Sequence, residues 1–491
     1  MATAAEAVRD YRQYIGGEWA AAASGETFVD ADPFTGEPVA TVPAGAAEDA
    51  RRAIEAAAAA FPSWSATPPA ERQRIFLKAA DVLESRRDEV VSLLARETGC
   101  TFGFGMFQLG FVPGLFRQAA AAPYAPIGEV IPSDNPGTFA MGVRKPVGVV
   151  GAIAPWNAAL ILSARSIAAP LALGNTVVLK PSEWSPVSGG LLWGEIFAEA
   201  GLPDGVLNVV THAPGGAGEI GDEFVSHPAV RRINFTGSTN VGRKLAEAAG
   251  RNLKRVVLEL GGYNPLIVLA DADLEYAVNA TAFGAFLHQG QICMSARRVL
   301  VERSVADEFT GKLAAKAKGL KAGDPKEPDT IIGPLINEQA LATVRDRVDE
   351  AVQKGARVLA GGEAAGPCYL ATVLADVPAD SELARQETFG PVLAVEVVDS
   401  ADEAVSRANA TSYGLAAGIL TSDVDRGFAL AHRLESGIVH VNDQPVGDEP
   451  QMPFGGVKDS GWGRFGGRAV LDEFTELRWI TVQSGSHPYP F

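Results

Sequence analysis

Short apolar runs rich in β-branched residues recur along the first half of the chain, with segments of helical length between most of them. Strands that are buried on both faces of a parallel sheet are continuously apolar, so this pattern predicts a parallel sheet covered by helices. The predicted strands are 147–153, 176–179, 206–210, 230–235 and 256–258. Two predicted helices, 188–200 and 240–249, are expected to end at Gly201 and Gly250, because glycine commonly terminates a helix.

A second alternation of helix-like and strand-like segments follows residue 259. It comprises the predicted helices 274–287, 309–317 and 344–353 and the predicted strands 298–301, 392–398, 415–420 and 438–441. A stretch rich in proline and glycine, 123–142, interrupts the helical first third of the chain. We therefore expect an α/β fold with one domain over 1–122 and 143–258 and a second α/β domain over 259–465.

The composition is that of an ordinary globular protein, with 491 residues, 47% hydrophobic and 21% charged. A formal net charge of -17 argues against a nucleic-acid partner, because phosphate binding requires clustered Lys and Arg. The uncharged run 147–164 contains Pro155 and Asn157, so it predicts a buried strand, a loop and the start of a helix. We expect neither a nucleic-acid partner nor a membrane segment.

The cysteines Cys100, Cys293 and Cys368 are far apart in the sequence, and any disulfide scheme leaves one of them unpaired. Their spacing is not that of a metal site, so no metal is expected, and a reducing compartment fits best. The opening residues 1–9 contain no apolar core followed by a cleavage site, which predicts a cytoplasmic protein.

Polar residues follow several of the predicted strands at the sheet edge where ligands bind in open parallel sheets. They are Asn157 after the first strand, Lys180 at the end of the second, Gly237 and Ser238 after the fourth and Glu259 at the end of the fifth. In 235–242 the order of strand, glycine turn and helix can direct backbone N–H groups at a phosphate, although the arrangement is common in proteins that bind none.

Cys293 lies in His-Gln-Gly-Gln-Ile-Cys-Met-Ser, 288–295, and Glu259 is followed by Gly261 and Gly262. A thiolate can attack an electrophilic carbonyl, and a carboxylate can activate the water that completes hydrolysis. An isolated cysteine is more often a small buried hydrophobe, and a strand-end glutamate is more often an ion-pair partner. The polar, glycine-containing surroundings of both residues favour the catalytic interpretation.

Three motifs, Glu259-Leu-Gly-Gly262, Gly290-Gln-Ile-Cys293 and Glu387-Thr-Phe-Gly-Pro391, resemble in order and spacing the signatures of the aldehyde dehydrogenase superfamily. The resemblance covers nearly the whole chain. It implies a Rossmann-like cofactor domain, an α/β catalytic domain and a small β oligomerisation arm formed by 123–142 and 466–491, with 479–482 as its C-terminal strand. A homodimer or homotetramer is therefore expected.

The same resemblance implies an aldehyde substrate that is oxidised to a carboxylic acid through a cysteine thiohemiacetal and a thioester. Cys293 corresponds to the nucleophile and Glu259 to the general base, while Asn157 and the backbone N–H of Cys293 correspond to the oxyanion donors. Relatives that transfer the acyl group to coenzyme A generally lack a carboxylate at the position of Glu259, so water is the expected acceptor.

A nicotinamide cofactor follows from the resemblance as well. The expected cofactor residues are Trp156, Lys180, Glu183, Gly237, Ser238, Glu387 and Phe389. Lys180 and Glu183 correspond to residues at the adenine ribose, and Glu387 and Phe389 to residues at the nicotinamide ribose and ring. The charge of Glu183 opposes a 2′-phosphate, so NAD is the expected cofactor, with NADP possible.

Phe104, Phe107 and Phe111 are spaced three and four apart, so they share one face of a helix that lines the substrate tunnel in the family. An aromatic aldehyde would fit such walls, although periodicity alone more often indicates core packing. Asn442 and Phe454 match family positions near the substrate mouth. Residues 288–295, 449–456 and 488–491 resemble the vanillin, benzaldehyde and salicylaldehyde dehydrogenase branch, which favours a vanillin-like hydroxybenzaldehyde.

Two other functions remain open from the sequence. An aliphatic or semialdehyde dehydrogenase, for example one acting on succinate semialdehyde, would need a cation in its pocket, and Arg165 and Arg117 are candidates. A binding protein that kept the fold but lost the chemistry is a third possibility. The intact set of candidate catalytic residues speaks against it.

Overall fold

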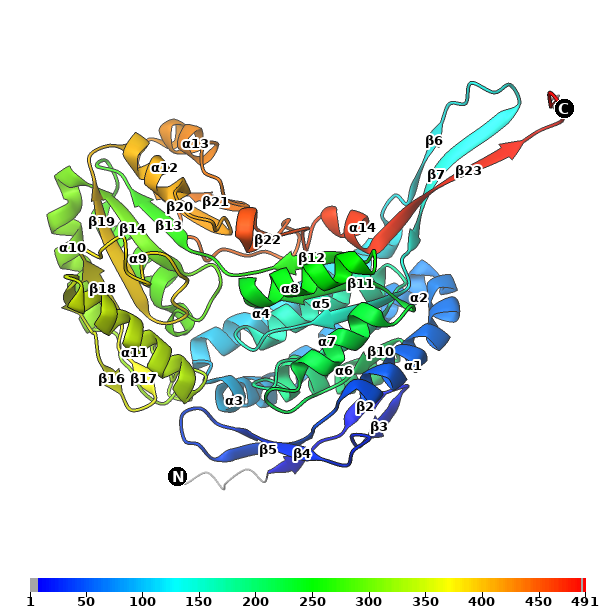
Figure 1. Ribbon diagram of the computed structural model, residues 1–491, viewed down its shortest axis with the longest axis horizontal. Coiled ribbons are helices and arrows are strands. Elements are labelled where there is room, and N and C mark those ends of the chain that lie inside the picture. Colours follow the sequence, from blue (N-terminus) through cyan, green and yellow to red (C-terminus); the bar gives the residue numbers. More distant parts are fainter. Residues whose placement is uncertain (1–7, 487–488) are drawn as a thin grey trace.

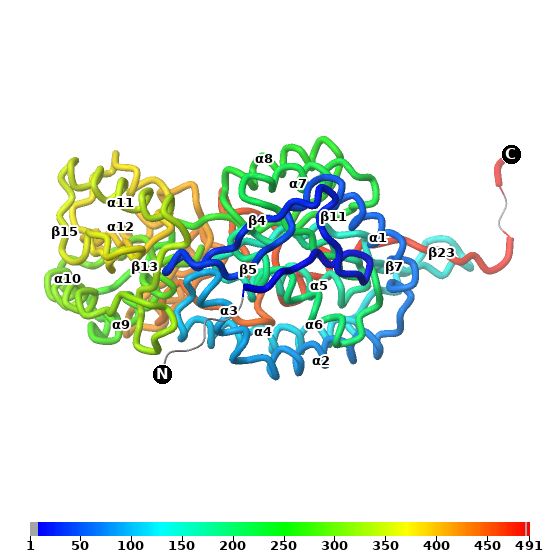
Figure 2. The backbone as a smooth tube through the Cα atoms, turned by 90° about the horizontal axis from the view of Figure 1, so that it is seen from below, coloured from blue at the N-terminus to red at the C-terminus, as the bar shows by residue number. Residues whose placement is uncertain are grey.

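The computed structural model describes residues 8–486 and 489–491, arranged as two α/β lobes and a projecting β arm (Figure 1). Figure 2 shows the second lobe, the first lobe and the arm following one another along the long axis. Residues 1–7, on which the expected absence of a secretory signal partly depends, and 487–488 near the C-terminus lie outside the described residues.

The first lobe carries an N-terminal β region and most of the helices before residue 251. Its strands are β1 (Arg9–Asp10), β2 (Gln13–Ile15), β3 (Glu18–Ala20), β4 (Thr27–Ala31), β5 (Pro38–Pro43), β8 (Val149–Ile153), β9 (Thr176–Lys180), β10 (Leu207–Val209), β11 (Val230–Thr236), β12 (Arg255–Glu259) and, from late in the chain, β22 (Gly461–Trp462). Its helices are α1 (Ala47–Ala66), α2 (Pro69–Ser85), α3 (Arg87–Thr98), α4 (Phe102–Ala121), η1 (Ala122–Tyr124), α5 (Ala159–Ala172), η2 (Val187–Leu191), α6 (Leu192–Ala200), α7 (Ala217–Ser226) and α8 (Thr239–Arg251).

Within the described residues, the main sheet of this lobe has the strand order β22-β12-β11-β8-β9-β10-β2-β3. Every residue of β8 and β9 is buried, as continuous apolar runs predict, and β8 to β12 pair in parallel. One face is covered by α2, α4, α5 and α6, and the other by α1, α7 and α8. The strand order reverses between β8 and β11, so a crevice for ligands is expected at their carboxyl ends.

The five strands predicted for this sheet are confirmed, and so is the end of α6 at Gly201, which is left-handed with φ 83. The predicted stop at Gly250 was wrong, because α8 continues through Gly250 to Arg251. The left-handed residue that follows the helix is the exposed Leu253, with φ 54. Gly250 therefore lies inside the last helical turn and does not terminate the helix.

The second lobe contains a sheet of order β15-β18-β19-β14-β13-β20-β21 in the part of the chain that is described. Its strands are β13 (Asn264–Val268), β14 (Ala296–Glu302), β15 (Arg357–Ala360), β18 (Thr372–Ala375), β19 (Val392–Val398), β20 (Ala416–Leu420) and β21 (Ile438–Val441), with the hairpin β16 (Ala364–Ala365) and β17 (Cys368–Tyr369) beside them. Its helices are α9 (Leu274–Phe286), η3 (Leu287–Gly290), α10 (Arg303–Lys318), α11 (Glu338–Gln353), α12 (Ala401–Asn409) and α13 (Val424–Ala431). The predicted alternation is confirmed, and the predicted helices 309–317 and 344–353 are the C-terminal parts of α10 and α11.

The chain crosses between the lobes more than once. After β21 it passes through η4 (Lys458–Ser460) to β22, which pairs antiparallel with β12 of the first lobe, with Gly461 opposite Glu259. The last strand of the first sheet is thus supplied by the segment that leaves the second lobe. Helix α14 (Ala469–Phe474) follows and leads into the arm.

The arm consists of β6 (Gly128–Ile131), β7 (Thr138–Pro146) and β23 (Thr475–Gln483), with β7 between the other two. The pairing of β7 with β23 runs from Thr138 opposite Gln483 to Pro146 opposite Thr475, so the arm strand extends past the predicted limit of residue 142. Large apolar side chains on the arm are exposed, among them Leu477 at 65% and Trp479 at 78%.

No helix in residues 8–486 and 489–491 is long and apolar enough to cross a membrane. The same described ranges contain no cluster of three or more His, Cys, Asp or Glu side chains suited to a metal ion. Cys100, Cys293 and Cys368 are all free thiols.

Candidate active site

Cys293 lies in the turn between η3 and β14, at the junction of the two lobes. Three consecutive residues before this turn are left-handed, with φ 50 at His288, 54 at Gln289 and 66 at Gly290. A Cβ atom at Gly290 would lie 2.2 Å from the carbonyl oxygen of Gly390, so only glycine fits there. Left-handed backbone at non-glycine residues costs on the order of 1–3 kcal/mol each, and such strain persists only where the surroundings fix the conformation.

Buried side-chain amides fix this nucleophile loop, which we define as residues 288–295. Gln289 Nε2 donates to the carbonyl of Pro334 at 3.0 Å, and Gln291 Oε1 accepts from the backbone N–H of Ile336 at 3.0 Å. Asn264 Nδ2 donates to the carbonyl of Cys293 itself at 2.7 Å. The cysteine is therefore held by contacts on both sides of it in sequence.

Asn157 follows β8 and reaches the same loop. Its Nδ2 donates to the carbonyl of Gln291 at 2.9 Å, and both Asn157 and Cys293 line one cavity. A side-chain amide carries two N–H groups, so a second donor remains beside the cavity. This is the position from which an amide can stabilise negative charge on a carbonyl oxygen bound to Cys293.

Glu259 ends β12 and is 3% exposed. Among the residues that the structure describes, no group makes a hydrogen bond of ordinary geometry to either carboxylate oxygen. Burial raises the pKa of Glu259 well above its ordinary value, while the positive charges of Arg165 and Arg464 oppose that rise. A desolvated carboxylate with raised pKa is a stronger proton acceptor than one in water.

The surroundings of Cys293 also shift the pKa of its thiol. Burial raises the pKa of Cys293 to about 12, and the negative charges of Glu387 and Glu259 add to that rise. The side chain is thus a thiol at neutral pH and needs a proton acceptor before it can act as a nucleophile.

The cavity beside Cys293 has aromatic walls. It is lined by Phe104, Phe107, Asn157, Ala158, Ile161, Leu162, Arg165, Ile292, Cys293, Met294, Val446, Asp448 and Phe454. The rings of Phe104 and Phe107 stack with their centroids 6.0 Å apart. Helix α4 therefore presents to the cavity two of the three phenylalanines that its periodicity singled out.

Two of the expected substrate residues lie outside this lining. Phe111 packs behind Phe107, with ring centroids 6.2 Å apart. Asn442 is left-handed with φ 60, and its side chain turns to accept a hydrogen bond from the backbone N–H of Thr421 at 3.0 Å. Asn442 therefore ties β21 to the segment after β20, and its expected place near the substrate mouth stays a prediction.

Arg165 and Asp448 form an ion pair inside the cavity wall, with Nη2 and Oδ2 2.5 Å apart and side chains 5% and 9% exposed. The Arg165 guanidinium also lies 4.3 Å from the centroid of the Phe454 ring. Arg165 Nη1 and Asp448 Oδ1 are buried and have no hydrogen-bond partner among the described residues. Arg117, the other cation considered from the sequence, is exposed and paired with Glu84 at 2.8 Å, outside the cavity lining.

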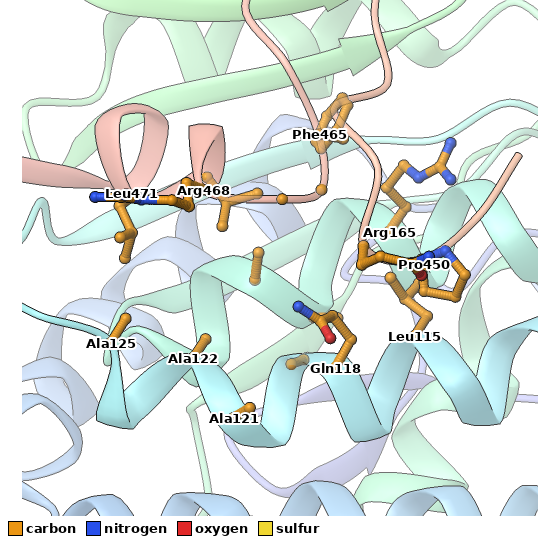
Figure 3. Close-up of a pocket in the computed structure, with 17 residues that line it drawn as sticks. Leu115, Gln118, Ala121, Ala122, Ala125, Arg165, Pro450, Phe465, Arg468 and Leu471 are labelled. Atoms are coloured by element: carbon orange, nitrogen blue, oxygen red, sulfur yellow. The ribbon is translucent and has the colours of Figure 1, made fainter.

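A larger apolar cavity of about 370 Å³ lies farther along α4, and Arg165 lines both cavities. In Figure 3, Leu115, Gln118 and Ala121 come from α4 and Ala122 from η1 below it, and Phe465, Arg468 and Leu471 come from the segment before and within α14 above it. Cys293 and Asn157 line the smaller cavity and not this one, so the chemistry belongs to the smaller cavity.

At the carboxyl ends of β9 and β10, Lys180 meets a histidine that the sequence interpretation missed. Lys180 Nζ lies 2.7 Å from His212 Nε2, and His212 Nδ1 lies 2.9 Å from the carbonyl of Ala213, so Nδ1 carries the proton and Nε2 accepts from the ammonium. Burial lowers the pKa of Lys180 to about 8 and that of His212 to about 4. Glu183 Oε2 lies 3.9 Å from His212 Nε2.

The other expected cofactor residues gather at neighbouring strand ends. Gly237 N–H donates to the carbonyl of Glu259 at 3.0 Å, and Ser238 caps α8 by accepting from the N–H of Val241 at 3.4 Å. Glu387 Oε1 accepts from the N–H of Gly262 at 3.3 Å. Together with the N-terminus of α8, Lys180 and the carboxylates of Glu183 and Glu387 lie at the edge where the strand order reverses. N–H donors and carboxylate acceptors in this combination fit a dinucleotide.

Phe389 and Trp156, the remaining expected cofactor residues, pack against each other. Their rings meet edge to face, with centroids 5.6 Å apart. The sequence interpretation did not single out His212, Asp448 or Arg297 of the candidate site. The pairs Lys180–His212 and Arg165–Asp448 join residues 32 and 283 positions apart, and a single sequence gives no signal for such contacts.

A model of the aldehyde dehydrogenase family matches residues 19–480. The vanillin dehydrogenase of Pseudomonas fluorescens is 49% identical over 476 residues, which cover 97% of this chain and 98% of that protein. The NAD(+) benzaldehyde dehydrogenase of Pseudomonas putida is 45% identical over 482 residues, covering 98% of each chain. A crystal structure of a salicylaldehyde dehydrogenase from Pseudomonas putida G7, complexed with salicylaldehyde, matches with a TM-score of 0.96 at 41% identity, covering 99% of this chain and 100% of that one.

Proposed function

The chain belongs to the aldehyde dehydrogenase family, an NAD(P)-dependent group of enzymes, and on that premise we propose that it oxidises aromatic aldehydes to carboxylic acids with NAD. The observation that carries the proposal is the meeting of Cys293, Asn157 and two stacked phenylalanines in one cavity, with the buried Glu259 nearby. Sequence similarity to aromatic aldehyde dehydrogenases over nearly the whole chain supports it.

In the proposed mechanism the Cys293 thiol loses its proton to water, and the sulfur adds to the aldehyde carbon. Asn157 Nδ2 and the N–H of Cys293 donate to the resulting oxyanion. A nicotinamide held by Glu387 and Phe389 would supply the acceptor for the hydride that leaves this carbon, so that a thioester remains on Cys293. Glu259 then takes a proton from water, the hydroxide adds to the thioester carbon, and the Cys293 sulfur leaves with release of the carboxylic acid.

The cavity wall supports a neutral aromatic substrate over one that carries a carboxylate. Asp448 already neutralises Arg165, so a carboxylate in the cavity would find no free cation. The unpartnered Arg165 Nη1 offers a donor and Asp448 Oδ1 offers an acceptor. A ring hydroxyl beside a second ring oxygen can satisfy both, which supports a vanillin-like hydroxybenzaldehyde.

We expect kcat/KM for benzaldehyde and vanillin to exceed that for succinate semialdehyde by about 100-fold or more, because burial of an unpaired carboxylate is unfavourable. NADH formation with each aldehyde in parallel measures this ratio. Asp448→Asn leaves Arg165 without a counter-charge, so it should lower the ratio of kcat/KM for the aromatic aldehydes to kcat/KM for succinate semialdehyde. Equal turnover of all three aldehydes by the wild-type protein would contradict the aromatic assignment, and no NADH from any of them would contradict the dehydrogenase activity.

Cofactor choice is proposed to rest on Glu183, whose negative charge would face a 2′-phosphate. Glu183→Gln is expected to raise kcat/KM for NADP relative to NAD by about tenfold, since removal of a repulsive charge relaxes specificity. Initial rates with both cofactors provide the measurement. Glu199→Gln, which removes the same charge from the exposed face of α6, is the matched control. An unchanged cofactor ratio in Glu183→Gln would place the discrimination elsewhere.

We propose that the arm joins subunits of this protein. The exposed Leu477 and Trp479 on the arm support a homodimer or homotetramer, because exposed apolar side chains gathered on a projecting strand mark association surfaces. The domain limits proposed from the sequence, with the arm as a separate unit, agree with this use of the arm. Free thiols support a cytoplasmic location.

A further inference from the structure

We propose that Arg297 is a positioning residue that couples the cofactor loop, defined as residues 387–391, to the peptide N–H that stabilises the oxyanion. The inference rests on the proposed function, because it concerns the oxyanion bound to Cys293. Arg297 lies at the start of β14, four residues after the nucleophile, and its side chain is 2% exposed.

The guanidinium of Arg297 binds both catalytic loops at once. Its Nη2 donates to the carbonyls of Gly290 at 2.7 Å and Ile292 at 3.1 Å in the nucleophile loop. Its Nη1 donates to the carbonyl of Gly390 in the cofactor loop at 3.0 Å. One rigid planar group therefore fixes the distance between these loops, where lysine would offer only a single point of attachment.

The contact with Ile292 has a chemical consequence. The carbonyl of Ile292 belongs to the same peptide as the N–H of Cys293, which is the second donor to the oxyanion in the proposed mechanism. A cation that donates to a peptide carbonyl polarises the peptide and strengthens its N–H as a donor. Arg297 thus acts on the oxyanion through this peptide, without touching the substrate.

The charge of Arg297 acts on the cofactor side as well. Burial raises the pKa of Glu387, and among the charges that oppose this rise Arg297 is the largest, so the guanidinium favours the carboxylate form. The guanidinium also lies 5.8 Å from the centroid of the Phe389 ring. The residues expected at the nicotinamide ribose and ring are therefore held by the same side chain that holds the nucleophile loop.

The backbones of the two loops also lie close together, at Gly290 and Gly390. The carbonyl of Gly390 accepts from Arg297 and also lies where a Cβ atom of Gly290 would be. Movement of the cofactor loop must therefore change the Arg297 contact or move Gly290 with it. Binding of the cofactor can thereby be transmitted to the peptide before Cys293.

Arg298 offers a matched control. It is the next residue of the same strand, 5% exposed, and it also binds backbone carbonyls, those of Arg407 at 2.9 Å and Ala408 at 2.7 Å. Its guanidinium lies 4.8 Å from the ring centroid of Tyr263. These contacts lie at the end of α12 and at Tyr263, outside both catalytic loops. Arg298→Lys therefore measures the effect of replacing a buried arginine that contacts neither loop.

The test compares Arg297→Lys with Arg298→Lys in the full-length protein. Both are assayed for Tm, for NAD affinity by quenching of tryptophan fluorescence, for the rate of Cys293 alkylation by iodoacetamide with and without NAD, and for kcat and KM with benzaldehyde. In Arg297→Lys we expect kcat to fall about 10- to 100-fold, NAD affinity to weaken several-fold, and NAD to lose its effect on alkylation. In Arg298→Lys each value should stay within about threefold of wild type.

The proposal is overturned if Arg297→Lys keeps the wild-type kcat and the wild-type response of alkylation to NAD, or if both variants lose them equally. Should Arg297→Lys fail to fold, Arg297→Gln, which carries a shorter and neutral side chain, is judged by the same measurements. Wild-type protein that binds NAD but oxidises no aldehyde would refute the proposed function. NAD affinity and alkylation would then still decide whether Arg297 couples the two loops.

Discussion

Replacement of Cys293 by alanine is expected to lower kcat by more than about 10³-fold for every aldehyde, because the variant has no sulfur to form the thiohemiacetal. NAD affinity should stay near that of the wild type, since the residues expected to contact the cofactor come from other positions. NADH formation at saturating aldehyde and a separate measurement of NAD binding distinguish the two effects.

Cys368 provides the control for this variant. Cys368 is buried in β17, and burial raises its pKa to about 11, so at neutral pH it is a thiol, as Cys293 is. Cys368→Ala should nevertheless keep wild-type kcat, because it does not line the cavity. Wild-type rates in Cys293→Ala would remove covalent catalysis from the mechanism altogether.

Glu259→Gln is expected to release about one equivalent of NADH per active site and then to stall, with steady-state turnover reduced about 10²- to 10⁴-fold. The amide cannot take a proton from water, so the thioester on Cys293 should persist. Stopped-flow absorbance measures the burst, and mass spectrometry of acid-quenched protein measures the acyl group on the peptide that contains Cys293. Steady turnover without a burst would show that another group activates the water.

Steady-state turnover of the wild-type protein should depend on pH through the ionisation of Glu259. A general base works when deprotonated, and burial raises the pKa of Glu259, so steady-state turnover should rise with pH over a range above that of an ordinary glutamate. In Glu259→Gln this rise should disappear. Glu302→Gln is the control, because Glu302 is also a buried strand-end carboxylate but accepts from the N–H of Ala270 outside the cavity.

The sequence predicted the strands that form the centre of each lobe because their environment is simple. β8 and β9 are buried on both faces, and such strands must be apolar throughout. The short strands β1 and β3 were not predicted, since their residues are largely exposed and carry no periodic pattern. Gly250 shows the same limit for single residues, because glycine permits the end of a helix without requiring it.

The candidate site was predictable where a residue follows a strand or stands inside a motif. Cys293, Glu259 and Asn157 satisfy that condition, and the structure brings Asn157 and Cys293 into one cavity. The pair of Arg165 and Asp448 joins residues that are 283 positions apart, and its existence depends on how α5 and the segment before Phe454 pack. Neither charge could be assigned a partner from local pattern alone.

The return of the chain from the second lobe to form β22 ties the stability of the two lobes together. Because Gly461 and Trp462 complete the sheet edge beside Glu259, a fragment that ends after β21 would leave β12 with an open hydrogen-bonding edge. The first lobe is thus incomplete until nearly the whole chain has been synthesised. Since Glu259 Oε1 also lies against Gly455, we expect Glu259 to reach its buried position only after the C-terminal segment has docked.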